Sequence, residues 1–327
     1  SSFKTSVIMK QKPSQNTERA PALSTTQIQE KKSQTKRRDD GLSRAVVNGA
    51  RFKVLGGKDI EEHGVCHVNR RAQTQGIADA TPLDQRMGNT KYQFLCPTCG
   101  KDAENCEGHY GILALVTGGA QHYIYSSPFK EFIPNIMRSI CFHCGEILLN
   151  DDMFIKGGYN RHKGEARIKE IADNVSGSAC PYCGTASVKI NSKKFDSENI
   201  LAVNNDKNPN NKNPTTFSEA DVYNLFNKIT PRALQRLGFS INNKPSSFIL
   251  TKLLVMPIVS RPSYFSNGGS SQLDQVSKKY NDILNAVNND PPSAISKKQY
   301  IYDTISDFFE NKDKNKTKVN RGTFWIK

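Results

Sequence analysis

The strongest hydrophobic period of this 327-residue chain lies near its C-terminus. The polar run 288–292, which includes two prolines, separates two segments of helical periodicity. In the first segment, apolar residues recur mostly at intervals of three or four, as on one face of an α-helix: Leu273, Val276, Tyr280, Ile283, Leu284 and Val287. In the second segment the apolar positions of the predicted helix are Ile295, Ile301, Ile305, Phe308 and Phe309.

Helices joined by so short a turn usually run antiparallel. We therefore predict a helical hairpin over 272–310 that projects from the body of the protein. Its tip would consist of Asn288, Asn289 and Asp290. The alternative is a pair of unrelated surface helices.

Two shorter helices are predicted upstream, within a segment of helices and strands that covers 217–271. Ser218 is a favourable N-cap for a helix that ends near Lys228. Thr230 and Pro231 begin the next helix, and Gly238 ends it. Residues 191–216 are dense in Asn, Lys and Asp, which is typical of an exposed polar loop.

Charge separates the two ends of the chain from the rest. The formal net charge is +15, and residues 1–38 hold nine Lys or Arg against two Glu. We interpret 1–45 as a basic low-complexity tail and 311–327 as a basic linker. A basic balance fits a nucleic-acid partner, because phosphate neutralisation drives such binding, but it fits a merely solvated surface equally well.

No stretch approaches the roughly 18 apolar residues that a membrane span requires. The first 38 residues also lack the apolar region of a signal peptide. These patterns predict a soluble intracellular protein without a membrane partner.

Seven of the eight cysteines occur at metal-ligand spacing in the region 46–190. A first cluster combines a Cys-x2-Cys turn with a Cys-x2-His turn, and zinc prefers four such N or S ligands at tetrahedral corners. Its four ligands fall within fourteen residues: Cys96, Cys99, Cys106 and His109. A second cluster pairs two Cys-x2-Cys turns across a longer excursion: Cys141, Cys144, Cys180 and Cys183.

Each cluster supplies four protein ligands and leaves no open coordination position. We therefore predict two structural Zn²⁺ ions rather than a catalytic metal. Their binding would support folding of a chain that is only 36% hydrophobic. A RING-type arrangement is excluded, because its ligands interleave and 31 residues separate His109 from Cys141. Cys66 is left over between His63 and His67. A third metal site there would have at most three local ligands, so we expect a half-buried free thiol instead.

These residues, in this order, resemble the N-terminal clamp region of the largest subunit of multisubunit DNA-directed RNA polymerases of the eukaryotic and archaeal type. The similarity includes Asp84-Gln85-Arg86-Met87-Gly88, the first knuckle from Cys96 to Gly111, and Arg261-Pro262-Ser263. Gln85 stands where the family usually has proline, and the basic tail is extra, which suggests a diverged lineage, with a large DNA virus as one candidate source. The resemblance covers about Gly57 to Phe309.

The resemblance implies an α+β fold: a zinc-stapled clamp of short strands and helices with the helical hairpin attached. It implies that the clamp holds DNA and the RNA–DNA hybrid in the polymerase cleft. Contacts to DNA would include Lys130 and Arg138. Initiation and elongation factors would dock at the tip, Asn288 to Asp290.

The family's catalytic magnesium is held by three aspartates of an Asp-x-Asp-x-Asp loop, and this sequence contains no such pattern. The chain should therefore be inactive alone, as part of a nucleotidyltransferase whose Mg²⁺ lies in the remainder of the enzyme. Its partners would be the rest of the largest subunit, the second-largest subunit and other polymerase subunits. The implied location is the nucleus, or a viral factory or virion.

Two alternatives come from other classes of protein. A stand-alone zinc-containing transcription factor would need a helix with base-reading Arg or Asn beside a zinc site, and none is recognisable. A purely structural scaffold would use zinc for folding alone and would not bind DNA.

Overall fold

A computed structural model of the chain describes residues 53–73, 78–90, 93–175, 178–187, 189–195, 199–203, 215–262, 264–265, 271–291 and 295–310. The chain divides at Lys53 and Val54 into two units, of which the second, Val54–Lys327, contains nearly all of the described residues. The elements below belong to the second unit. The predicted basic tail and basic linker lie outside the described residues. Among the described helices, none combines the length and apolarity that crossing a membrane requires.

A three-stranded sheet supports the first metal-ligand cluster and the C-terminal helices. Its middle strand β2 (Tyr110–Ala114) pairs in parallel with β1 (Gly64–His67) and antiparallel with β10 (Lys252–Val255). β2 begins directly after His109, so the sheet fixes the end of the first knuckle. The alternating burial of β10 sends Leu253 and Val255 into the core, as expected for a half-buried strand.

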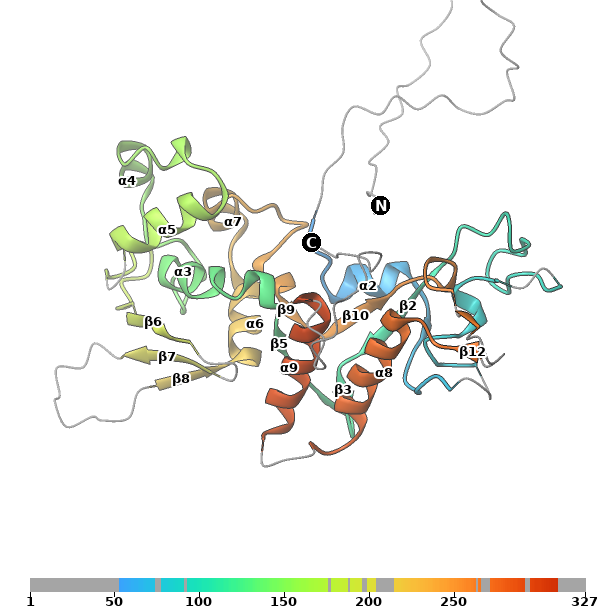
Figure 1. Cartoon of the computed structure of the whole chain (residues 1–327). Coiled ribbons are helices and arrows are strands. Elements are labelled where there is room, and N and C mark those ends of the chain that lie inside the picture. The colour runs from blue at the N-terminus through green and yellow to red at the C-terminus, as the bar shows by residue number, and fades with distance from the viewer. Residues whose placement is uncertain are drawn as a thin grey trace, which may run out of the picture. The chain divides into compact units, whose positions relative to one another are not determined.

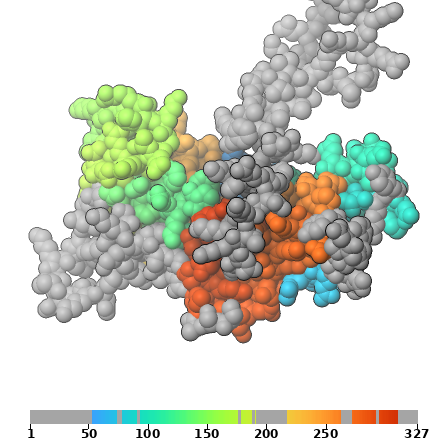
Figure 2. Space-filling model, viewed as in Figure 1, coloured from blue at the N-terminus to red at the C-terminus, as the bar shows by residue number. Residues whose placement is uncertain are grey.

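Helix α8 (Gln275–Asn288) packs on this sheet and against α9 (Lys297–Glu310). The two helices lie beside each other in Figure 1, and in the space-filling view they form the orange-red centre of the same face (Figure 2). The rings of Tyr280 and Phe308 lie 5.2 Å apart, and Lys297 Nζ donates to the carbonyl of Asn289. The start of α8 therefore meets the end of α9, and the two helices run antiparallel. Asp274 caps α8 by accepting from Val276 N at 2.8 Å.

The expectation that this helix pair projects from the body is wrong for α8. Its buried positions extend beyond the stripe facing α9, and Tyr280 Oη donates to the carbonyl of Leu254 on β10 at 3.2 Å. Asn281 also bonds both backbone groups of Ala72. Polar residues of the helix thus hold it against the body, a contact that hydrophobic periodicity does not reveal. Ile295 is exposed and precedes α9.

A second cluster of buried residues lies among α3 (Phe132–Ser139), α5 (Gly164–Val175), α6 (Glu219–Lys228) and α7 (Pro231–Leu237). The predicted caps of the last two helices are confirmed. Ser218 accepts from Asp221 N and Thr230 accepts from Ala233 N, while Gly238 ends α7 with a left-handed φ of 91°.

The predicted polar loop 191–216 is only partly a loop. The structure forms a three-stranded antiparallel sheet from β6 (Lys189–Phe195), β7 (Asn199–Val203) and β8 (Thr215–Ser218). β7 contains the apolar run Ile200-Leu201-Ala202-Val203, which favours a strand despite the polar composition around it. The Asn-rich stretch 204–214 lies outside the described residues.

Short elements complete the described chain and connect the two buried clusters. Mixed helices and strands make the fold α+β. The remaining elements are α2 (Gly57–His63), η1 (Gln85–Met87), β3 (Val116–Thr117), β4 (Ala120–Gln121), β5 (Ile124–Tyr125), η2 (Ser127–Phe129), α4 (Asp151–Lys156), η3 (Tyr159–Arg161), η4 (Pro245–Phe248), β9 (Ile249–Leu250), η5 (Ile258–Ser260), β11 (Tyr264–Phe265) and β12 (Ser271–Gln272).

Candidate metal centres

The first predicted ligand cluster comes together at one point, which we call the first metal centre. The ligand atoms of Cys96, Cys99, Cys106 and His109 all lie within 4.8 Å of one another. Cys99 Sγ is 3.7 Å from Cys106 Sγ, and Cys106 Sγ is 3.8 Å from His109 Nε2. Sulfur ligands about 2.3 Å from a tetrahedral zinc ion lie about 3.8 Å apart, so the spacing fits such an ion.

Backbone hydrogen bonds shape the Cys-x2-Cys turn of this centre. Cys96 N donates to Lys101 O at 2.8 Å, and Gly100 N donates to Cys96 O at 2.8 Å. Gly100 has a φ of 67°, in the left-handed region where a side chain is strained. The turn therefore directs both thiols to the same side.

The Cys-x2-His turn is held by the neighbouring η1 and η5 segments. His109 N donates to Met87 O at 2.9 Å, while Thr98 Oγ1 ties the Cys-x2-Cys turn to the same segment by donating to Arg86 O at 2.7 Å. A Cβ on Gly108 would lie 2.5 Å from carbons of both Pro257 and Val259, so this close approach requires glycine. Distant parts of the sequence thus fix the second pair of ligands.

The second metal centre consists of the ligand atoms of Cys141, Cys144, Cys180 and Cys183, which lie within 4.8 Å of one another. Cys141 Sγ is 3.5 Å from Cys183 Sγ, and Cys144 Sγ is 3.7 Å from Cys180 Sγ. These separations again fit sulfurs around one tetrahedral ion. The second centre joins the end of α3 to a segment that follows α5.

The two turns of the second centre share the backbone pattern of the first. Cys141 N donates to Glu146 O at 2.8 Å, and Cys180 N donates to Thr185 O at 2.9 Å. A Cβ on Gly145 would lie 2.4 Å from Lys228 O, so glycine lets this turn approach the end of α6. Both centres therefore have the geometry of a four-ligand structural site, and either could hold a metal ion.

Comparison with known proteins places this geometry in a family. A family model described as RNA polymerase Rpb1, domain 1 matches residues 44–299, well over half of the chain. The chain belongs to this family. The matched span includes both metal centres and all of α8.

Curated relatives include RNA polymerase subunits from a eukaryote, an archaeon and a virus. The chain is 24% identical over 258 residues to DNA-directed RNA polymerase II subunit RPB1 of Euplotoides octocarinatus, covering 74% of this chain and 53% of that protein. It is 25% identical over 261 residues to subunit Rpo1N of Sulfolobus acidocaldarius, with 74% and 28% covered. The RPB1 homolog of African swine fever virus is 26% identical over 246 residues, with 74% and 16% covered.

The chain thus spans about half or less of the length of these relatives. The resemblance to the N-terminal part of an RNA polymerase largest subunit is confirmed.

Cys66 joins neither metal centre in the described part of this Rpb1 domain. It is buried on β1 with 4% of its surface exposed, rather than half-buried as expected. Burial raises the pKa of its thiol to about 11, so it is protonated near neutral pH.

The two residues predicted to contact DNA both have partners within the chain. Lys130 Nζ is 3.3 Å from Tyr302 Oη and lies over that ring. Arg138 Nη2 pairs with Asp173 Oδ1 at 3.0 Å, across the contact between α3 and α5. DNA binding by either side chain would have to compete with these contacts.

The three residues predicted to contact factors are all exposed at the end of α8. Asn288 Nδ2 donates to Asn69 O at 3.2 Å, so one side of the tip touches the segment that follows β1. The side chain of Asn289 donates to Asn285 within the helix. The tip is therefore accessible and locally ordered by polar contacts.

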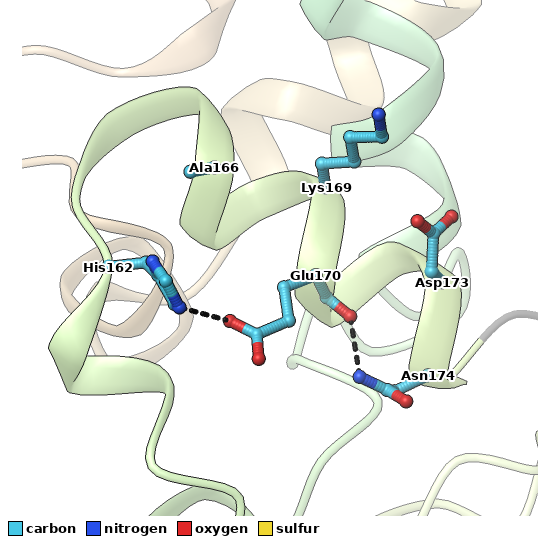
Figure 3. A pocket seen from close by; sticks show the side chains of 6 residues that line it. All are labelled: His162, Ala166, Lys169, Glu170, Asp173 and Asn174. Atoms are coloured by element: carbon cyan, nitrogen blue, oxygen red, sulfur yellow. Dashed lines mark hydrogen bonds and ion pairs between the residues drawn. The ribbon is translucent and has the colours of Figure 1, made fainter.

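A surface pocket of about 390 Å³ lies along α5. Its polar groups pair with their neighbours: His162 Nε2 is 3.6 Å from Glu170 Oε2, and Asn174 Nδ2 donates to Glu170 O at 2.9 Å. Figure 3 shows these pairs among the lining residues His162, Ala166, Lys169, Glu170, Asp173 and Asn174. These pairings are local and involve three of the lining residues.

Sequence reasoning missed residues that support the first centre from outside it. Met87 is fully buried and accepts from His109 N, and Arg261 is buried against Met87. Both residues lie in segments that resemble the family, but the spacing of the metal ligands did not indicate a role for either residue. A charged residue inside the otherwise uncharged segment Ile258 to Pro262 is the signal that could have identified Arg261.

Proposed function

We propose that this chain forms the clamp of a DNA-directed RNA polymerase, holding DNA and the RNA–DNA hybrid in the cleft and docking initiation and elongation factors. The observation that carries the proposal is the presence of two four-ligand centres inside a span that matches Rpb1, domain 1. Two structural metal centres suit a module that moves as a rigid body while it holds nucleic acid.

Zinc is the ion that the donor sets favour. Three thiolates with one imidazole, and four thiolates, are the ligand sets of structural zinc sites. Bound Zn²⁺ would stabilise the folded turns without taking part in chemistry. Magnesium would bind only in the remainder of the enzyme, because it prefers oxygen ligands.

The proposed partners are the remainder of the largest subunit, the second-largest subunit and other subunits of the same polymerase. The chain would contribute to nucleotidyl transfer only within that assembly. Its location would then be the nucleus, or a viral factory or virion, since relatives include eukaryotic and viral polymerase subunits.

Contact with DNA in this proposal is electrostatic and does not read bases. Phosphate contacts position a protein on DNA without sequence discrimination. Lys130 and Arg138 remain the proposed contacts, together with the basic tail. For Arg138, the competing partner within the chain is Asp173.

Duplex binding by the whole chain, titrated against salt, tests this contact. We expect weak affinity that falls steeply as salt rises. Arg138→Gln should weaken binding, and Asp173→Asn should strengthen it by releasing Arg138. Asp152→Asn, an exposed change of equal charge on α4, serves as the control for net charge.

The double variant Arg138→Gln with Asp173→Asn should lose the gain that Asp173→Asn gives alone. If Asp173→Asn and Asp152→Asn increase DNA affinity equally, Arg138 does not contact DNA. Strong discrimination between DNA sequences at equal salt would favour a transcription factor over a clamp.

A further inference from the structure

Arg261 is an arginine in the interior of the protein. Only 2% of its surface is exposed, and no carboxylate in the described part of the chain forms an ion pair with its guanidinium. Burying an unpaired charge is costly unless its hydrogen bonds are satisfied. The contacts that satisfy Arg261 therefore show what it stabilises.

The guanidinium bonds three separate segments of the chain. Nε donates to Met256 O at 2.9 Å, after β10. Nη1 donates to Ser277 Oγ at 2.7 Å, in the first turn of α8. Nη2 donates to Pro82 O, ahead of η1. A planar group with five N–H donors can span such a set of acceptors, which a lysine ammonium cannot do in the same way.

One side of this network reaches the first metal centre through Met87. Met87 Sδ is 3.9 Å from Arg261 Nη2, and Met87 O accepts from His109 N at 2.9 Å. Met87 is fully buried, and a Cβ on Gly111 would lie 2.5 Å from its sulfur. The η1 turn therefore has little room to move independently of the His109 ligand.

The other side of the network reaches α8 at two positions one turn apart. Ser277 is fully buried, and the Arg261 guanidinium lies 5.5 Å from the ring centre of Tyr280. Tyr280 Oη in turn accepts from Met256 N at 3.2 Å. Arg261 and Tyr280 thus share Met256 as a backbone partner.

We infer that Arg261 is a positioning residue that couples the first metal centre to α8. Through this coupling, the metal-bound knuckle and the exposed tip of the helix pair keep a fixed position relative to each other. Loss of metal at the first centre would loosen the start of α8, and loss of Arg261 would loosen the first centre. The inference rests on the proposed function, because it requires a metal ion bound at the first metal centre.

The two metal centres of the same chain allow a site-resolved test. The zinc-loaded full chain is mixed with EDTA and N-ethylmaleimide, and alkylation of each cysteine is followed by peptide mass spectrometry. Arg261→Met should speed alkylation of Cys96, Cys99 and Cys106 about tenfold, the lower end of the effect of outer-shell partners on metal sites. Alkylation at the second centre should change less than twofold.

Two further variants separate coupling from general destabilisation. Arg232→Met truncates an arginine that lies over Tyr182 beside the second centre, and it should leave alkylation at the first centre unchanged. Ser277→Ala removes only one acceptor of Arg261 and should produce a smaller effect of the same kind. It also keeps the test available if Arg261→Met fails to fold.

Amide exchange tests the coupling in the opposite direction. Cys99→Ser should speed exchange in the first turns of α8 but not in α7. The inference is wrong if Arg261→Met and Ser277→Ala change neither centre, or change both equally. Absence of metal from the first centre of the unsubstituted chain would instead contradict the proposed zinc binding.

Discussion

At the scale of single residues, Asp84 shows how one buried carboxylate orders the approach to the first metal centre. It caps η1 by accepting from Arg86 N at 3.0 Å, and it accepts from Ala80 N at 2.6 Å. Ala80 has a left-handed φ of 58°, which costs a non-glycine residue about 1 kcal/mol. The carboxylate also pairs with the Arg86 guanidinium at 2.6 Å.

Asp84→Asn should therefore reduce the free energy of unfolding by about 2 kcal/mol near neutral pH, because a charged acceptor of several hydrogen bonds is lost. Burial alone would raise the pKa of Asp84, but its bonds to Arg86 and Ala80 lower it overall. Urea unfolding of both proteins across pH measures the difference.

A carboxylate with a depressed folded-state pKa stabilises the protein above its unfolded-state pKa, and this stabilisation is lost as pH falls through the folded-state value. The difference between wild type and Asp84→Asn should stay constant from about pH 8 to pH 5 and shrink below about pH 4. A difference that grows on acidification would contradict this role.

At the scale of elements, an ion pair between a buried carboxylate and a partly exposed lysine joins α6 to α9. Glu219, the first residue of α6, is fully buried and pairs with Lys298 of α9. Removing the cation would leave the carboxylate without this counter-ion, and breaking a buried pair typically costs about 3–5 kcal/mol.

Lys298→Met should accordingly lower the free energy of unfolding by about 3 kcal/mol, toward the lower end because Lys298 is partly exposed. Lys278→Met, at an exposed position of α8, is the matched control and should stay within about 0.5 kcal/mol of wild type. Chemical denaturation of wild type and both variants measures these differences in the free energy of unfolding. Equal stability of the two variants would mean that the ion pair contributes nothing to stability.

The tip of the helix pair should contribute little to the stability of the fold. Asn289 and Asp290 are exposed, so changing both to alanine should alter stability by no more than about 0.5 kcal/mol. Recovery of initiation or elongation factors with the assembled polymerase should fall. Glu165→Ala with Lys169→Ala, on the exposed side of α5, is the matched control. Unchanged factor recovery would remove the tip as a docking site.

At the scale of the whole molecule, local signals in the sequence predicted much of what the structure contains. The knuckles follow from ligand spacing, because each turn closes within a few residues. The caps at Ser218 and Thr230 follow from side chains that bond a backbone N–H three residues away. Both helices of the C-terminal pair follow from their apolar period.

Contacts between distant segments could not be predicted in this way. The parallel pairing of Gly64 with Tyr110, and the three acceptors of Arg261, join segments that no local pattern relates. The predicted projection of the hairpin was wrong because Tyr280 and Asn281 hold α8 on the body with polar atoms. Strand β7 was not predicted, because its short apolar run lies within the polar stretch 191–216.

The proposed clamp depends on two structural zinc ions, and metal stoichiometry tests this dependence most directly. Native mass spectrometry of the folded chain should show two zinc ions. Cys99→Ser and Cys144→Ser should each retain one, because the two centres share no ligand. One zinc ion or none in the well-folded unsubstituted chain would contradict zinc binding at both centres.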